Sequence, residues 1–209
     1  MRRDNETLPD TRRRDLLAAG GPGGVDQRAL VEPLLRDTDS RTRVLALRVG
    51  AVHQWWTDER WLDALRDEHE DVRREAAWSL ARVNALSLVL TAELVIAIRD
   101  ADALVADAAI FACGEHEERG AVETLIEVAA QHEDARCRES AVAALGAIGD
   151  DRAQNVIIAA LGDKPPVRRR AVVALSNFEG PAVEAALEGA LEDRDWQVRV
   201  AAEQLNGLD

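Results

Sequence analysis

Apolar residues recur along the chain with the spacing of a helix, and that spacing is itself repeated six times. Between Asp71 and Val83 the apolar positions fall on one helical face, at Val72, Ala76 and Leu80. An arginine follows the first of them. The same frame recurs 30 to 33 residues apart, from the anchors Thr42, Val72, Leu104, Cys137, Val167 and Val198. A near-fixed period of this length indicates a solenoid, in which each unit packs against its neighbours.

Each unit predicts two helices joined by a short turn. The second helix, helix B, carries the anchor, which we number +0. The first, helix A, is expected at Gln27–Leu35, Asp58–Arg66, Ala92–Arg99, Ala121–Ala130, Ala153–Leu161 and Ala182–Leu191. The turns into helix B are rich in aspartate, which caps a helix and opposes its positive end. The prediction is an all-α fold, an α-solenoid of about six helix-pair repeats over residues 25–209.

Residues 1–24 lie outside the repeat and end in the run Gly20-Gly21-Pro22-Gly23-Gly24. This composition predicts a flexible N-terminal tail. A short helix over Thr11–Ala19, packed against the first repeat, is the alternative.

The +1 arginine is present in five of the six copies, for example as Arg73 and Arg168, and copy three is assigned Val105 instead. A long side chain at this edge of the buried stripe covers apolar surface, and its guanidinium reaches an aspartate of a neighbouring turn. We therefore expect a structural ladder of arginines along the solenoid.

Composition narrows the class of partner and the compartment. The formal net charge is -13, which disfavours nucleic acid and anionic membranes as partners. Lys164 is the single lysine among 26 basic residues, a bias that resembles proteins of halophiles. The chain shows neither an apolar run of membrane-spanning length nor a signal peptide. Cys113 and Cys137 are expected to be reduced and buried, so the predicted location is cytoplasmic.

The phrase D-x-x-V-R-x-x-A-x-x-A-L resembles the HEAT-like repeats first named in phycobilisome (PBS) bilin lyases, and Asp163–Leu175 is the closest copy. The resemblance implies an armadillo/HEAT-like superhelix with helix B lining the concave side. Its relatives include scaffolds, bilin lyase subunits, deoxyhypusine hydroxylases and, more distantly, DNA alkylation-repair glycosylases, so the fold alone does not select a function.

A hydroxylase of this fold would need His-Glu pairs at +2 and +3 of several helices B, and no histidine stands there. The three His-Glu pairs of the chain begin at His69, His116 and His132. They fall in separate turns and on opposite edges, too far apart to share a metal. We therefore expect no metal, no cofactor and no catalytic residue.

Positions +2 and +6 of helix B lie opposite the buried stripe, on the predicted concave surface. The +6 positions are apolar in the middle copies, and charged residues at +2 and +3 flank them, an arrangement suited to binding a helix or peptide. The alternative is that neighbouring helices cover these side chains. The predicted groove comprises Arg48, Arg74, Trp78, Asp107, Ile110, Glu139, Val173, Arg169 and Arg170.

Trp55, Trp56, Trp61 and Trp78 fall close together in the sequence. Tryptophan is a frequent anchor of binding surfaces, but the first repeats also need large side chains to close the end of the array. We favour the second interpretation, with Trp78 as the exception because of its +6 position.

The function these patterns favour is a non-catalytic adaptor or scaffold that binds another protein in the concave groove. One alternative is a lyase-like or hydroxylase-like enzyme, which would carry a chromophore or iron. The other is a nucleic-acid-binding protein with a continuous arginine strip through Arg48, Arg74 and Arg169, which Asp107 and Glu139 interrupt. The sequence indicates neither the partner's identity nor the oligomeric state.

Overall fold

The computed structural model describes residues 27–206, which form twelve α-helices and three short 3-10 helices without a strand. The helices A are α2 (Gln27–Val31) with η1 (Glu32–Arg36), α4 (Asp58–Leu65), α6 (Leu88–Ala97), η2 (Arg119–Ala121) with α8 (Val122–Gln131), η3 (Asp151–Ala153) with α10 (Gln154–Ala160), and α12 (Pro181–Ala190). The helices B are α3 (Ser40–Val52), α5 (Glu70–Leu80), α7 (Ala103–Glu115), α9 (Ala135–Ile148), α11 (Pro165–Leu175) and α13 (Trp196–Asn206). The predicted N-terminal tail lies outside the described residues.

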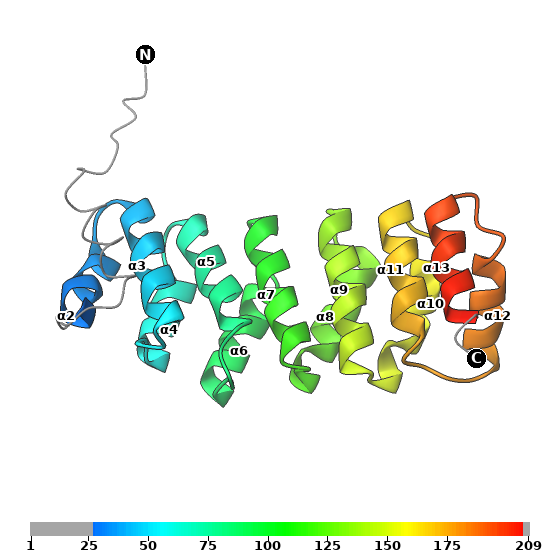
Figure 1. The fold of residues 1–209 in the computed structure, drawn as a ribbon, viewed down its shortest axis with the longest axis horizontal. Coiled ribbons are helices and arrows are strands. Elements are labelled where there is room, and N and C mark those ends of the chain that lie inside the picture. Colours follow the sequence, from blue (N-terminus) through cyan, green and yellow to red (C-terminus); the bar gives the residue numbers. More distant parts are fainter. Residues whose placement is uncertain (1–26, 207–209) are drawn as a thin grey trace, which may run out of the picture.

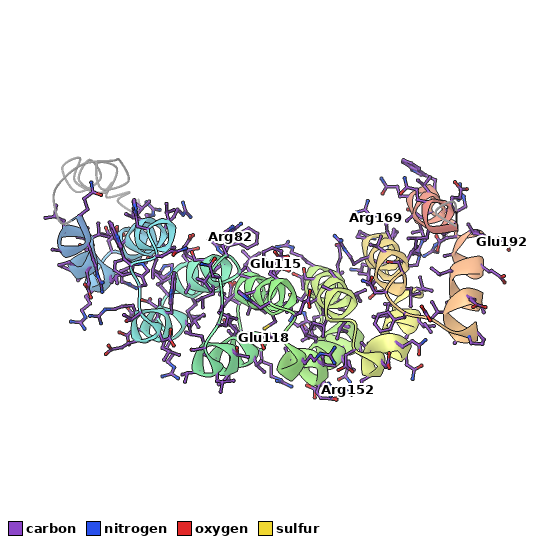
Figure 2. All side chains as sticks on the ribbon, turned by 60° about the horizontal axis from the view of Figure 1, so that its bottom comes forward. Arg82, Glu115, Glu118, Arg152, Arg169 and Glu192 are labelled. Atoms are coloured by element: carbon purple, nitrogen blue, oxygen red, sulfur yellow. The ribbon has the colours of Figure 1, made fainter. Side chains whose placement is uncertain are left out.

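The six helix pairs stand side by side in two layers, and the long axis of the molecule runs across them (Figure 1). Each helix B packs against the helices B before and after it and against its own helix A. Viewed along the helices, the helices B form the inner row of a shallow arc and the helices A the outer row (Figure 2). The predicted all-α solenoid is confirmed.

The repeat frame of copy three differs by one residue from the sequence prediction. In copies one, two, four and five the anchor is the third residue after the helix N-cap, as Cys137 is after Asp134. In copy three the N-cap is Asp102, whose carboxylate accepts hydrogen bonds from the N–H groups of Leu104 and Val105. Val105 is fully buried, whereas Leu104 is 38% exposed. The anchor is therefore Val105, and the residue that replaces the +1 arginine is Ala106.

The same positions of helix B form the core in successive copies. Position +5 of each helix B faces the next copy and is buried in the first five, as Leu47, Ala77, Ile110, Val142 and Val172. In α13 the same position is the exposed Glu203. The α13 surface at this position is thus polar, as in the capping repeats of solenoids.

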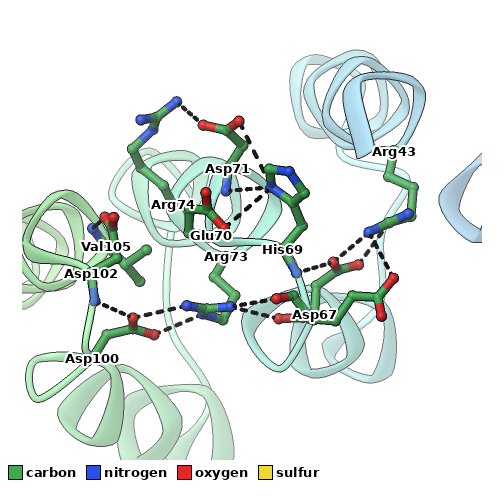
Figure 3. A network of polar contacts seen from close by, with 11 residues as sticks. Arg43, Asp67, His69, Glu70, Asp71, Arg73, Arg74, Asp100, Asp102 and Val105 are labelled. Atoms are coloured by element: carbon green, nitrogen blue, oxygen red, sulfur yellow. Dashed lines mark hydrogen bonds and ion pairs between the residues drawn. The ribbon is translucent and has the colours of Figure 1, made fainter. Parts of the chain in front are cut away.

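The predicted arginine ladder is confirmed (Figure 3). In each rung the guanidinium donates through Nε and Nη2 to both carboxylate oxygens of an aspartate in the next copy's turn. Through Nη1 it also donates to a backbone carbonyl of its own turn, as Arg73 does to Asp67 at 2.9 Å. Within residues 27–206 four rungs form, namely Arg43–Asp67, Arg73–Asp100, Arg138–Asp163 and Arg168–Asp193.

The rung between copies three and four is absent, and both of its residues are replaced. Ala106 takes the place of the arginine, and His132 takes the place of the aspartate in the following turn. His132 keeps the aspartate's local role, since its Nδ1 accepts the Asp134 N–H at 3.1 Å. In the described part of the chain the ladder is therefore two separate pairs of rungs.

The ladder predicts a dependence of stability on pH. The hydrogen bond from Arg138 holds the pKa of Asp163 below its usual value. A carboxylate with a depressed folded pKa stabilises the fold above its unfolded pKa of about 3.9, and this contribution is lost as the pH falls through the folded pKa. We expect Asp163→Asn to be less stable than the wild type by about 2 kcal/mol at pH 7, and the difference to shrink below pH 4. Urea unfolding at pH 7, 5 and 3 measures it; an equal difference at every pH would contradict the assignment.

Candidate functional site: the concave face of the helices B

The concave face is made from four positions of helix B, counted from the corrected anchors. Positions −1, +2, +6 and +10 fall within about 80° of one another on a helix of 100° per residue. Figure 2 shows residues of this set, Arg82, Glu115 and Arg169, on the inner side of the arc, and Arg152 on the outer side. The +6 positions run through the middle of the face, as Arg48, Trp78, Phe111, Ala143, Val173 and Gln204.

Three apolar residues were expected in the groove, and the structure places two of them on its surface. Trp78 is 43% exposed and Val173 is 46% exposed. Ile110 is fully buried, so its assignment to the groove was wrong. With the anchor at Val105, Ile110 becomes a +5 residue that faces the next copy. Phe111 takes the +6 position.

The predicted charged residues of the groove form local pairs with one another and with neighbours. Arg74 contacts Asp71 at 2.7 Å on α5. Asp107 accepts a hydrogen bond from Ser140 of α9 at 2.5 Å, and Glu139 lies 3.7 Å from Arg170 of α11. The last two contacts link adjacent helices B, while Arg169 is exposed.

Trp78 lies at the centre of an aromatic and cationic cluster. Its ring stacks on Phe111 with 4.9 Å between centroids and 26° between planes. The Arg82 guanidinium lies 4.5 Å from the centroid of the Trp78 ring, close enough for a cation–π contact. Arg82 Nη1 also donates to the Trp78 carbonyl at 2.8 Å, which holds the guanidinium in place. The sequence prediction placed the anchor of copy three one residue too early and therefore did not assign Phe111 to the groove. The N-cap at Asp102 is the signal that would have given the correct anchor.

A cavity of about 760 Å³ opens beside Trp78, between the C-terminal ends of α3 and α5 and the loops that follow them. The buried Trp56 and Trp61 line it together with Val52, which is 76% exposed. The Trp56 indole N–H donates to the Leu47 carbonyl at 2.9 Å, so its polar group is satisfied inside the protein. Two of the clustered tryptophans thus belong to the core, and Trp78 presents its ring at the edge of the cavity.

Arg48 borders the same cavity and is fixed by Glu75 of the next helix B. The guanidinium contacts both carboxylate oxygens, with Nε to Oε1 at 3.1 Å and Nη2 to Oε2 at 2.5 Å. The Glu75 side chain is mostly buried, whereas the Arg48 side chain is 59% exposed. A bidentate pair of this kind holds a long side chain in one orientation. The cavity therefore has a rigid polar border on the α3 side.

The described residues show no cluster of three or more histidine, cysteine or acidic side chains that could hold a metal. Both cysteines are buried and unpaired. Burial raises the pKa of Cys113 to about 12 and that of Cys137 to about 11. Neither is a thiolate at neutral pH. No helix of the described range is long and apolar enough to cross a membrane.

Two family models match the repeats whose geometry is described above. The model for HEAT repeats matches residues 91–171, and the model for the PBS lyase HEAT-like repeat matches residues 167–193. Residues 91–193 thus consist of HEAT repeats. No curated protein matches the chain closely enough to show a relationship.

Several solved structures share this HEAT-repeat architecture at low sequence identity. An engineered protein aligns with a TM-score of 0.68 and 23% identity over 87% of this chain and 97% of its own. A designed armadillo repeat protein in complex with the peptide (KR)4 has a TM-score of 0.64 and 18% identity, over 88% of this chain and 99% of its own. The complex of CpcE and CpcF of phycocyanin lyase from Nostoc sp. aligns at 0.64 with 21% identity, over 90% of this chain and 77% of that one. Such likeness shows the fold.

Proposed function

We propose that this protein is a non-catalytic adaptor that binds a segment of another protein on its concave face, in a signalling or assembly complex. The observation that carries the proposal is Trp78, an exposed aromatic ring held rigidly at the centre of that face, beside the 760 Å³ cavity. Tryptophan in such a setting is the residue type most enriched among binding anchors. A peptide-bound repeat protein and a complex of two lyase subunits among the structural neighbours support a protein partner.

The concave face has the anatomy that the binding of a peptide or helix requires. Val52, Trp78 and Val173 present apolar surface, and the charged residues at +2 and +3 border it. The local ion pairs hold that border in place, so little ordering entropy is lost on binding. The two unpaired cysteines suit a reducing compartment, and we propose a cytoplasmic location on this ground.

The proposal is tested with peptides selected on the purified chain from a displayed 15-residue library. We expect Trp78→Ala to weaken the affinity for a selected peptide by about 30-fold, equivalent to about 2 kcal/mol, because a hot-spot side chain is truncated. Fluorescence polarisation measures the affinity, and circular dichroism checks the fold.

The matched control is Trp196→Ala. Trp196 is 63% exposed at the start of α13, away from the cavity, and its loss should leave the affinity within twofold. Equal losses for the two variants, or a library that yields no binder, would overturn the proposal.

A further inference from the structure

We infer that the segment bound on the concave face is acidic, with one apolar side chain that enters the cavity beside Trp78 and carboxylates that meet the arginines of this face. The inference rests on the proposed function, since it specifies the chemistry of the partner. It begins from the distribution of charge over the two faces of the solenoid.

The outer face and the turns account for most of the exposed acidic residues of the described chain. Several arginines of the outer row pair with acidic residues of neighbouring helices A. Arg66 pairs with Glu93 at 2.5 Å and Arg152 with Glu123 at 2.7 Å. Arg99 likewise pairs with Glu127. The outer face is therefore anionic, in keeping with the net charge of -13.

The concave face, unlike the outer face, carries an excess of positive charge. Its carboxylates at Asp71, Asp107 and Glu139 are all engaged by neighbouring side chains. Four exposed arginines of this face, in contrast, have no carboxylate at ion-pair distance anywhere in residues 27–206. They are Arg41 of α3, Arg82 of α5, Arg136 of α9 and Arg169 of α11.

The contacts of two of these arginines show that they remain available to a ligand. Arg82 binds the Trp78 carbonyl and ring, both of which are uncharged. Arg169 contacts only the amide oxygen of Gln197, at 3.5 Å. Glu115 is the one exposed acid of the set, so four arginines face a single unpaired carboxylate. A positive strip of this kind attracts an acidic segment and repels a basic one.

The positions of the arginines suggest the spacing of the ligand. The Arg82 guanidinium lies over the Trp78 ring. A ligand carboxylate bound to Arg82 would therefore lie next to the ligand's apolar side chain in the cavity. Neighbouring helices B lie about 10 Å apart, and an extended chain covers that distance in about three residues. Two helix spacings of about 20 Å in all and eleven residues of helical rise, about 16 Å, separate Arg82 from Arg136. An acid about eight residues from the first would therefore meet Arg136, and one about three residues further on would meet Arg169.

The test compares peptides that share one apolar residue but differ in charge. From the displayed library we expect binders enriched in aspartate and glutamate, with affinity that falls as sodium chloride rises. Arg82→Glu with Arg169→Glu should weaken the best acidic peptide by at least about tenfold and bind its glutamate-to-lysine counterpart more tightly than the wild type does. Arg119→Glu, a single charge reversal at an exposed arginine in η2, should leave the affinity within twofold, whereas Arg82→Glu alone should weaken it.

Other outcomes separate this inference from the proposed function. Neutral or basic peptides that bind in a Trp78-dependent manner would overturn the acidic partner and leave the adaptor standing. Tighter binding of a 20-nucleotide single-stranded DNA than of any peptide would overturn both, and so would the recovery of no binder. An equal loss in the Arg119→Glu control would show that net charge, rather than the concave arginines, governs affinity, and would overturn the inference.

Discussion

Replacing Arg168 by alanine is expected to lower the free energy of unfolding by about 3 kcal/mol, because the change leaves a partly buried carboxylate without its counter-ion. Arg168 is 3% exposed and donates to both carboxylate oxygens of Asp193 at 2.8 and 2.9 Å. Its Nη1 also donates to the Asp163 carbonyl at 2.8 Å. A single substitution thus removes three hydrogen bonds and the covering of apolar surface by the arginine stem.

Arg199 offers a matched control for this prediction. It holds the same +1 position in α13 and makes the same contact to its own turn, from Nη1 to the Asp193 carbonyl at 2.7 Å. In the described residues it has no aspartate of a following turn to bind. We expect Arg199→Ala to cost about 1 kcal/mol. Urea unfolding followed by circular dichroism compares the two variants, and equal losses would show that the rung to the next copy contributes nothing.

The second large effect is expected at Gly146, where α9 lies close to Ala174 of α11. A Cβ atom at this glycine would lie 2.6 Å from Ala174 Cβ and 2.9 Å from Ala174 Cα. The neighbour is backbone, which cannot rotate away, so the helices must separate. We expect Gly146→Ala to destabilise the fold by about 3 kcal/mol, the upper part of the range for overpacking.

Gly189→Ala is the control for the change of residue type. Gly189 lies in α12 and a Cβ there meets nothing within 4 Å. Alanine favours a helix over glycine by up to about 1 kcal/mol, so this variant should be as stable as the wild type or more so. Thermal unfolding of both variants measures the difference. A Gly146→Ala protein that unfolds at the wild-type temperature would show that the two helices separate without cost.

The sequence was sufficient for the architecture because its signals are local and recur. The period, the buried stripe and the arginine at +1 each follow from helical geometry, and the partner of that arginine is an aspartate found in most turns. The prediction failed where one copy lacks the arginine. Leu104 and Val105 are both apolar, so periodicity allowed two frames, and the cap at Asp102 selects the second.

The site was less predictable than the fold because it depends on distances between copies. The exposure of Trp78 follows from its place in one helix, and the sequence indicated it. Its stacking on Phe111 and the cavity beside it depend on how α3, α5 and α7 pack and on the loops after them. The sequence also could not show which arginines lack an ion-pair partner, since a chain with 39 acidic residues contains many possible partners.

The joint between α7 and α9 lacks a rung but is held by other contacts. At one edge, α7 and α9 lack the arginine–aspartate link that joins other helices B. At the opposite end of the same helices, a Cβ on Gly114 would lie 3.0 Å from the Ala144 backbone, so the two helices touch. At the edge without the rung, Cys137 Sγ donates to the Ala103 carbonyl at 3.3 Å and Ser140 Oγ donates to Asp107 at 2.5 Å. Hydrogen bonds from α9 to α7 therefore take the place of the ion pair, and the array continues from one of these helices B to the next without an arginine–aspartate link.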